Sequence, residues 1–507
     1  MTDRRRLTIP LVFAGLAWLL YFLPGVFGAY GIFIDELYYV SCAKRLAWGY
    51  VDHPPLAPFL LRGALAIFGD SIVALRVPAA TCGALVVLLT GWVSGRLGAS
   101  RYGQAIACAA VISSPLLQVL FGYYSMNGIE LVLWLGLGAT LLEIERRGDG
   151  RWWLLFGALA GVALLTKHTV TTYAAALGVG LLLTPARRHL RSPWLWTGAA
   201  IALVLAAPNA IWQHAHGWPS LEFYRNAALY KNNPASAGEI VLQQALFMSP
   251  GVLPVTLAGL AWLWRRPAAQ LRHIPVQFVV MLGLLMWSAQ SRPDRLAGLY
   301  PLLFAAGGVW LGELAAARRV VRIALPIWIA AWGLLLLPVG TPLLSPDQTA
   351  QHLARLGISH QSERGAGKRT PLPQYFADRL GWPLLVDDVA AVRDTLPPDE
   401  RMRVAFFAQS YGQASALDWL GASRQLAPVY STHNTWFYWG PPAVNPEVAI
   451  VLGDDRESLE ALFGEVTQSR VHECGACMPW RNHMPIWIVR KPKVRLADKW
   501  PEWKKFE

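Results

Sequence analysis

Long apolar stretches separated by short polar turns occupy most of the first 339 residues. A helix needs about 20 predominantly apolar residues to cross a bilayer, so the pattern predicts about eleven membrane-spanning helices. The first follows Arg4, Arg5 and Arg6, and no cleavage site of small residues comes after it. We therefore expect it to be retained, with a cytoplasmic N-terminus. The expected spans centre on residues 8–28, 78–95, 104–122, 128–144, 152–167, 169–184, 194–212, 241–263, 274–290, 299–314 and 322–339.

Arginines gather in every second connection between these stretches. Cytoplasmic loops of membrane proteins carry an excess of Lys and Arg, and this bias sets the orientation. The opposite connections are poorer in basic residues and richer in Trp, Tyr, Pro and Asn, so they are expected outside the cytoplasm. The arginine-bearing connections hold Arg96 and Arg101; Arg146, Arg147 and Arg151; Arg187, Arg188 and Arg191; Arg265, Arg266 and Arg272; and Arg318, Arg319 and Arg322.

The apolar pattern ends after Pro338, and residues 340–507 are expected to form a soluble domain on the outer side. Short apolar runs in this part predict strands, and longer amphipathic stretches predict helices, so a small α/β domain is expected. The predicted strands are Val404–Ala408, Val448–Leu452 and Pro485–Val489, and the predicted helices are Pro373–Thr395 and Glu457–Phe463.

Composition agrees with a chain solvated largely by lipid. Of its 507 residues 54% are hydrophobic and 15% are charged, whereas soluble domains carry about 25% charged residues. The net charge of +13 does not indicate a nucleic-acid partner, because the arginines lie in short runs between apolar stretches.

Ionisable residues occur repeatedly on the side expected to face outward. The first outer connection, residues 31–77, contains Asp35 and Glu36, then Asp52 and His53, and it is expected to form short helices along the membrane surface. Charged side chains at membrane spans are costly, so they commonly mark functional sites. Further along the chain, the same side carries Glu130, Lys167, His168, Arg292, Asp294 and Arg295.

Carboxylates beside cations suit the transfer of a sugar from a phosphate-bearing lipid to a hydroxyl. A carboxylate can accept the proton of the acceptor hydroxyl. Lys and Arg can stabilise the charge that grows on the departing phosphate. A membrane-carried donor is expected because an outward-facing enzyme has no nucleotide sugar at hand. The long connection 213–240 is a candidate lid for such a cavity.

Each of these residues also has a structural explanation. Asp35 and Glu36 could cap a helix, since acids favour helix N-termini. Glu130 could pair with Lys167 between two spans, while His53 could simply sit in a Pro-rich turn. Lys167, His168, Arg292 and Arg295 could anchor helices at the lipid headgroups.

Cys474 and Cys477 are the only closely spaced cysteines. In an oxidising compartment such a pair most often forms a disulfide. A zinc site with His472 and His483, or a redox-active pair, is a less favoured alternative.

The first outer connection resembles a known family. Asp35-Glu36-Leu37-Tyr38-Tyr39, then Gly49 to Leu56 and Arg76, are similar to bacterial dolichyl-phosphate-mannose–protein mannosyltransferase-like glycosyltransferases, relatives of the aminoarabinose transferases that modify lipid A. The resemblance continues through residues 124–127, 165–168, 208–212, 217–219 and 299–301, and into the soluble domain at 411–416 and 433–440.

This resemblance implies the GT-C architecture and an inverting transfer from a polyprenyl-phosphate monosaccharide. It implies that Asp35 is the catalytic carboxylate and general base, with Glu36 beside it in the catalytic site to position the acceptor or the donor. His53 stands where aminoarabinose transferases carry a lysine that contacts the lipid phosphate, so Lys167, Arg292 or Arg295 is expected to supply that charge. The residues expected to bind donor or substrate are Asp52, His53, Arg76, Asn127, Glu130, Lys167, His168, Arg292, Arg295 and Tyr300.

The sequence thus predicts a polytopic α-helical membrane protein with a transmembrane catalytic domain over 1–339 and a periplasmic α/β domain over 340–507. It is expected in the bacterial inner membrane as a glycosyltransferase acting on an envelope lipid, glycan or protein. A transporter or flippase of lipid-linked sugars is the alternative, and a membrane-anchored scaffold comes third. The residues establish no cofactor and leave open whether a divalent metal takes part.

Overall fold

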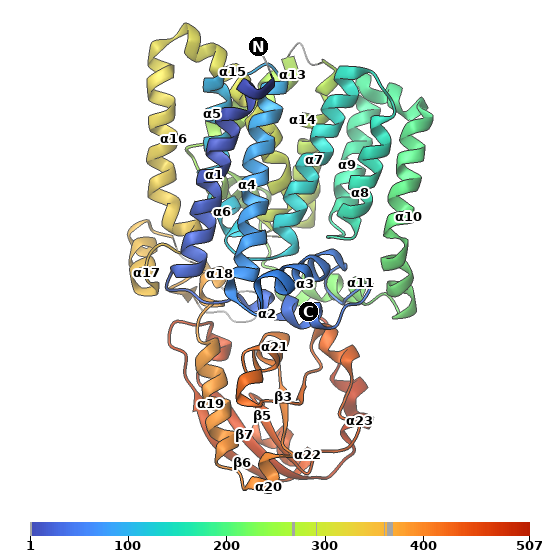
Figure 1. The fold of residues 1–507 in the computed structure, drawn as a ribbon, viewed down its shortest axis with the longest axis vertical. Helices are drawn as coiled ribbons and strands as arrows, with labels where there is room; N and C mark the ends of the chain where they lie inside the picture. The colour runs from blue at the N-terminus through green and yellow to red at the C-terminus, as the bar shows by residue number, and fades with distance from the viewer. Residues whose placement is uncertain (1–2, 266–268, 291, 359, 362–368) are drawn as a thin grey trace.

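A computed structural model describes residues 3–265, 269–290, 292–358, 360–361 and 369–507. Arg266, one of the expected cytoplasmic arginines, lies outside the described residues. Figure 1 shows a bundle of long helices at one end of the molecule and a smaller unit containing a sheet at the other. The N-terminus lies at the far end of the bundle, and the C-terminus lies where the bundle meets the smaller unit (Figure 1).

Within the described residues, six helical segments are long and apolar enough to cross a membrane, or up to eight if each of two bent pairs is one span. They are α1 (Asp3–Phe27), α4 (Ile72–Arg96), α7 (Met126–Arg147), α10 (Pro193–Ala215), α15 (Tyr300–Ala317, with the 3-10 turn η4, Pro293–Leu299, before it) and α16 (Arg319–Gly340). The bent pairs are α5 (Arg101–Ile112) with α6 (Pro115–Phe121) and α12 (Ala237–Met248) with α13 (Leu253–Arg265).

The described residues also contain four shorter apolar helices: α3 (Leu56–Phe68), α8 (Trp152–Leu164), α9 (Val170–Leu183) and α14 (His273–Ser288). The last three complete the set of expected spans. Every stretch expected to span the membrane therefore coincides with a helix or a bent pair. The polytopic helical fold is confirmed, while the count of eleven crossings stays a prediction.

Small residues allow the helices of the bundle to approach closely. A Cβ atom added to Gly157 of α8 would collide with the carbonyl oxygen of Gly198 in α10. Transmembrane helices pack in this way because lipid supplies no hydrophobic force between them, so close backbone contact contributes more.

Arginines of the expected cytoplasmic turns are paired with carboxylates at the ends of the helices. Glu143 near the end of α7 accepts hydrogen bonds from Arg96, Arg146 and Arg147. These pairs let the carboxylate stay charged at the end of an apolar helix.

Short helices lie between the bundle and the smaller unit (Figure 1). The first expected outer connection forms two of them, α2 (Ile34–Lys44) and α3 (Leu56–Phe68). The expected loop 213–240 forms α11 (Pro219–Asn226) and one π-helical segment (Ala227–Lys231).

The smaller unit is built on a five-stranded sheet with the order β4-β3-β5-β7-β6. Strands β4, β3 and β5 are parallel, and β7 and β6 join them antiparallel. The strands are β3 (Ala405–Ala408), β4 (Val429–Tyr430), β5 (Val448–Leu452), β6 (Phe463–His472) and β7 (Met484–Pro492), and two short strands, β1 (His360–Gln361) and β2 (Arg369–Thr370), pair separately.

Helices cover both faces of this sheet. Residues of α19 (Trp382–Asp394) and α21 (Tyr411–Trp419) pack with Phe406 and Ile450 on one face. Residues of α22 (Arg456–Leu462) and α23 (Leu496–Lys499) pack on the other. The remaining helices are α17 (Pro346–Arg355), α18 (Gln374–Ala377), α20 (Pro398–Arg401) and the 3-10 turn η8 (Trp500–Trp503).

The expected α/β character is confirmed, with differences in detail. The helix expected over 373–395 is split into α18 and α19, because Gly381 adopts a left-handed φ of 85° and Pro383 follows in the first turn of α19. Strands β4 and β6 were not predicted. Strand β4 has only two residues. Strand β6 lies beside β7 at one edge of the sheet and is mostly exposed, so it lacks an apolar run.

Candidate functional site

The first turn of α2 carries Asp35 and Glu36, the two acidic residues that the sequence singles out. The structure gives their side chains different surroundings. Glu36 is fully buried and forms an ion pair with Arg76 of α4. Its carboxylate also accepts hydrogen bonds from the backbone N–H groups of Phe33 at 2.8 Å and Tyr124 at 2.7 Å. Glu36 and Arg76 therefore hold the start of α2 against the bundle.

Asp35 lies on the side of α2 that meets the smaller unit. The hydroxyl of Tyr411, the first residue of α21, donates a hydrogen bond to its Oδ1 atom at 2.7 Å. The sequence placed Tyr411 only within a family-like stretch. Contact with Asp35 arises because residues 376 positions apart meet in the fold, and no local pattern reports that.

Asp52 is held by a second contact between the two units. The Tyr38 hydroxyl of α2 donates to Asp52 at 2.9 Å and lies 2.6 Å from the hydroxyl oxygen of Thr435. The same oxygen of Thr435 accepts from the backbone N–H of Val51 at 3.0 Å. Residues of the smaller unit thus fix the loop that carries Asp52.

His53 is buried inside a box of tyrosine rings. Its ring centroid lies 4.8 Å from that of Tyr39 and 4.7 Å from that of Tyr50. Burial lowers the pKa of His53 below its ordinary value, so the imidazole is neutral at pH 7. These surroundings do not favour a phosphate contact through a charged His53, which leaves the lysine and arginines as the sources of positive charge.

Lys167 lies at the centre of a charged cluster between α7, the α8–α9 turn and η4. Its Nζ atom is 2.8 Å from Oδ1 of Asn127, 3.2 Å from Glu130 and 3.7 Å from Asp294. Glu130 also accepts a hydrogen bond from the hydroxyl of Thr169. The expected Glu130–Lys167 pair is therefore present. Because Lys167 also contacts Asp294, it joins three segments that are distant in the sequence.

Two arginines extend this cluster. Arg292 pairs with Asp294 at 3.1 Å and donates to the side chain of Asn232 at 3.2 Å. Arg295 has no carboxylate within 4 Å among the residues that the structure describes. Lys167 and Arg292, in contrast, each form an ion pair with a carboxylate of the cluster.

His168 connects α11 to the bundle. Its Nδ1 atom is 3.0 Å from the Tyr224 hydroxyl, and its Nε2 atom is 3.0 Å from Oδ1 of Asn209. Burial lowers the pKa of His168, so the neutral ring accepts from Tyr224 and donates to Asn209.

The side chains of these segments share one electrostatic environment. Burial raises the pKa of Tyr224, and the charges of Asp52 and Glu130 raise it further. The positive charges of Arg292 and Arg295 act in the opposite direction and lower this pKa. The pKa of Tyr123 is likewise raised by burial and by Asp35. Carboxylates and cations from the first connection, α7, the α8–α9 turn and η4 therefore meet at the end of the bundle that faces the smaller unit.

Arg379, which the sequence did not single out, enters this region from the smaller unit. Its Nε atom donates to the carbonyl of Tyr375 at 3.0 Å, and its guanidinium lies 5.4 Å from the centre of the Tyr123 ring. Burial lowers the pKa of Arg379 to about 10, so it remains charged at neutral pH.

The other predicted residues lie within the scaffold. The Tyr300 hydroxyl is buried in the bundle and lies 3.0 Å from Gln244. Cys474 and Cys477 are joined as a disulfide. His472 contacts Asp388 at 2.7 Å, and His483 faces Glu473 instead of the cysteines. These contacts do not fit the zinc alternative, and no group of three or more metal-binding side chains occurs in the described part of the chain.

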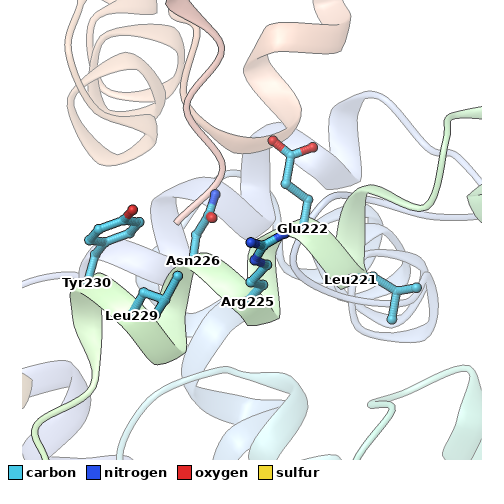
Figure 2. A pocket seen from close by; sticks show the side chains of 6 residues that line it. All are labelled: Leu221, Glu222, Arg225, Asn226, Leu229 and Tyr230. Atoms are coloured by element: carbon cyan, nitrogen blue, oxygen red, sulfur yellow. The ribbon is translucent and has the colours of Figure 1, made fainter.

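A depression of about 540 Å³ lies along α11 and the π-helical segment after it. Figure 2 shows its six lining residues, with Glu222 and Asn226 pointing toward the smaller unit. Asn226 donates to the carbonyl of Phe506 at 2.8 Å, and Glu222 pairs with Lys504 at 2.8 Å. The segment proposed as a lid is therefore bound to the end of the chain on one face and to His168 on the other.

A bundle of long apolar helices, with charged residues gathered at the end that meets an α/β unit, defines a polytopic membrane protein. Residues 52–212 match the model of the dolichyl-phosphate-mannose-protein mannosyltransferase family. The resemblance drawn from the motifs is thus confirmed: the chain is related to these GT-C membrane proteins.

The fold extends over nearly the whole chain. ArnT from Cupriavidus metallidurans, in a crystal structure with undecaprenyl phosphate bound, is 15% identical and superimposes with a TM-score of 0.60 over 94% of this chain and 97% of that one. The arabinofuranosyltransferase AftD from Mycobacteria is 15% identical with a TM-score of 0.52, over 97% of this chain and 40% of that one.

One curated relative matches over a shorter region. The lipid A galacturonosyltransferase RgtD from Rhizobium johnstonii is 28% identical over 201 residues, which is 38% of this chain. The match spans 40% of that relative's length.

Proposed function

We propose that this protein is an inverting membrane glycosyltransferase that moves a monosaccharide from a polyprenyl-phosphate carrier to a hydroxyl of an envelope lipid, glycan or protein. The observation that carries the proposal is the charged cluster around Lys167, beside Asp35 and Asp52 at one end of the bundle. The relatives support it, because ArnT was solved with undecaprenyl phosphate and RgtD is named a lipid A galacturonosyltransferase.

In the proposed reaction the acceptor oxygen attacks the anomeric carbon while the bond between that carbon and the phosphate oxygen breaks. The acceptor proton passes to the carboxylate of Asp35. The electron pair of the broken bond leaves with the phosphate, whose growing charge Lys167, Arg292 and Arg295 stabilise. Because attack and departure occur on opposite faces, the anomeric configuration inverts.

Glu36 has a supporting role in this mechanism. Its carboxylate is occupied by Arg76 and two backbone N–H groups, so it fixes the start of α2 and thereby the position of Asp35. Asp52 holds Tyr38 at the same helix. We therefore place Glu36 and Arg76 among the positioning residues.

We also infer the arrangement in the cell. Residues 1–339 would form the catalytic unit in the bacterial inner membrane, with the N-terminus in the cytoplasm and residues 340–507 in the periplasm. The arginine-rich turns support this orientation. The flippase alternative gains no support, because the charged cluster lies at one end of the bundle and alternating access usually uses a site near the midplane.

The test compares envelope glycans by mass spectrometry in a deletion strain that expresses wild type, Asp35→Asn or Asp70→Asn. Asparagine keeps an acceptor for Tyr411 but cannot take the proton, so we expect the product sugar to fall at least 100-fold, within the range for loss of a general base.

Asp70 is the matched control, because it belongs to the same connection and is exposed to solvent. Asp70→Asn should restore the sugar fully. Full restoration by Asp35→Asn at equal expression would remove Asp35 as the base and favour a carrier or scaffold role.

A further inference from the structure

A cavity of about 340 Å³ lies in the smaller unit, on the face of the sheet covered by α22 and the C-terminal turns. Small-molecule sites in proteins usually measure about 300–1,000 Å³. Its lining includes the carboxyl ends of the parallel strands β3 and β4, where Ala408–Gln409 and Tyr430–Thr432 lie. Ligands of open α/β sheets bind in crevices at this edge.

Aromatic rings form much of the cavity wall. Phe407 and Tyr430 are register partners on neighbouring strands, and their rings lie 5.3 Å apart with 28° between their planes. Trp500 and Trp503 of η8 also line the cavity. The two strand residues thus form a stacked aromatic pair in the wall, and the indole rings add further apolar surface.

Polar side chains line the same cavity. Gln409 and Asp454 are exposed to solvent and joined by a 2.9 Å hydrogen bond, and Thr432, Ser458 and Lys505 also line it. A sugar ring has this same combination of surfaces, with C–H groups on its faces and hydroxyls around its edge. Hydroxyls both donate and accept, so they fit a set of amide, carboxylate, hydroxyl and ammonium groups.

A short chain of contacts connects this cavity to the candidate active site. The backbone N–H of Lys505 donates to the carbonyl of Thr432 at 3.1 Å, and His433 follows. The His433 ring lies 4.9 Å from the Tyr411 ring, and Tyr411 donates to Asp35. A ligand in the cavity would therefore bind to the segment that packs against Tyr411, and Tyr411 contacts the proposed base.

We propose that this cavity binds a sugar unit of the acceptor, so that the acceptor is a glycan or a sugar-bearing lipid. This inference rests on the proposed transferase function, and it assigns to the smaller unit the selection of the acceptor. The donor sugar is recognised separately, at the charged cluster around Lys167.

The experiment uses the purified full-length protein in detergent and the glycan released by mild acid from the deletion strain's envelope. Binding of this glycan is followed by tryptophan fluorescence, and transfer is measured against glycan and donor concentrations. We expect Trp503→Ala to weaken glycan binding and raise the acceptor KM about tenfold, the scale of one lost aromatic contact. The donor KM and kcat should change less than about twofold, because the charged cluster is intact.

Two further variants make the result specific. Trp503→Phe keeps an aromatic face and should recover most of the binding. Trp480→Ala removes an exposed tryptophan of the same unit that does not line the cavity, and it should bind like wild type.

Each outcome decides the proposal. Glycan binding that is absent in wild type, or equal in wild type and Trp503→Ala, would overturn the acceptor cavity. If the glycan binds through Trp503 but wild type transfers no sugar, the cavity stands and the proposed transferase function fails.

Discussion

At the residue scale, the proposed catalytic carboxylate depends on a side chain that comes from the other unit. Tyr411 donates to Asp35 at 2.7 Å, and a hydrogen bond to a charged group is worth about 1.5–3 kcal/mol. Tyr411 does not contact the reacting atoms in the proposed mechanism. It is a positioning residue that orients Asp35 and favours its charged form.

Tyr411→Phe removes this hydroxyl and keeps the ring. We expect kcat to fall on the order of tenfold to a hundredfold, from the strength of a charged hydrogen bond. The donor KM should stay unchanged. The acidic limb of the pH–rate profile should move to higher pH, because a carboxylate that loses a donor binds a proton more readily.

Tyr438→Phe is the control, since the Tyr438 hydroxyl donates to the carbonyl of His216 at 3.1 Å. An unchanged pH–rate profile in Tyr411→Phe would show that the Tyr411–Asp35 contact is merely structural.

His433 makes the fold sensitive to acid. Burial lowers the pKa of His433 to about 3, and Lys505 and Lys231 add to the effect. Its Nε2 atom is 3.1 Å from the carbonyl of Glu507, and its Nδ1 atom has no partner in the described part of the chain. A proton added at Nδ1 would therefore be buried without an acceptor.

The unfolded chain binds this proton near pH 6.5 and the folded chain only near pH 3, so stability falls as the pH drops between these values. At pH 5 the loss from His433 is about 2 kcal/mol relative to pH 8. His433→Gln should keep the donor to Glu507 and reduce the difference in unfolding temperature between pH 8 and pH 5. His483→Gln, at an exposed histidine, should leave that difference as in wild type.

At the element scale, α2 is held between the bundle and α21. Asp418 of α21 accepts two hydrogen bonds from Arg45, at 2.8 and 3.2 Å, and one from Ser41 at 3.0 Å. Burial opposes its charge, but Arg45, Lys44 and Ser41 keep the pKa of Asp418 below its usual value. Tyr411 lies at the start of α21 and Asp418 lies near its end, so both ends of α21 contact the α2 region.

Asp418→Ala should loosen this contact between the two units. We expect a loss of about 1–2 kcal/mol, since a bidentate, partly buried pair is worth more than an exposed one. The measurements are thermal unfolding of the full chain and the rate of limited proteolysis. Glu460→Ala breaks the exposed pair with Arg456 and should change stability by less than about 0.5 kcal/mol. Equal effects of the two variants would contradict a specific role for Asp418.

At the scale of the whole molecule, the proposed reaction requires the charged cluster of the bundle and the smaller unit to face the same side of the membrane. The charged cluster lies at the bundle end that meets the smaller unit, and the N-terminus lies at the opposite end (Figure 1). A donor phosphate at the cluster and an acceptor held by the smaller unit would then meet at Asp35.

Reporter fusions test this orientation. Alkaline phosphatase fused after Glu507 should be active, because it folds only outside the cytoplasm, while green fluorescent protein at the same position should stay dark. The positive-inside pattern is the physical reason. Bright fluorescence from the C-terminal fusion would place the smaller unit in the cytoplasm and contradict the proposed orientation.

The sequence predicted the structure well where neighbouring residues decide it, and poorly where residues distant in the chain decide it. The spans of α1, α4 and α16 were predictable because each is a continuous apolar run that must bury its own backbone hydrogen bonds in lipid. Strand β6 was not, because it is mostly exposed and its pairing with β7 supplies its order. The motif singled out Asp35, whose catalytic role stays a prediction, whereas no local pattern indicated the contacts of Tyr411 and Arg379.

By itself, the sequence determined what local composition controls: the apolar helices, the expected direction of insertion, the α/β character of residues 340–507 and the motif that begins at Asp35. Only the tertiary structure decided that Glu36 is buried in an ion pair, that His53 is buried among tyrosine rings, and that Lys167 joins Glu130 and Asp294. The physical reason is that burial and charge pairing depend on residues far apart in the chain, whose meeting the fold alone specifies.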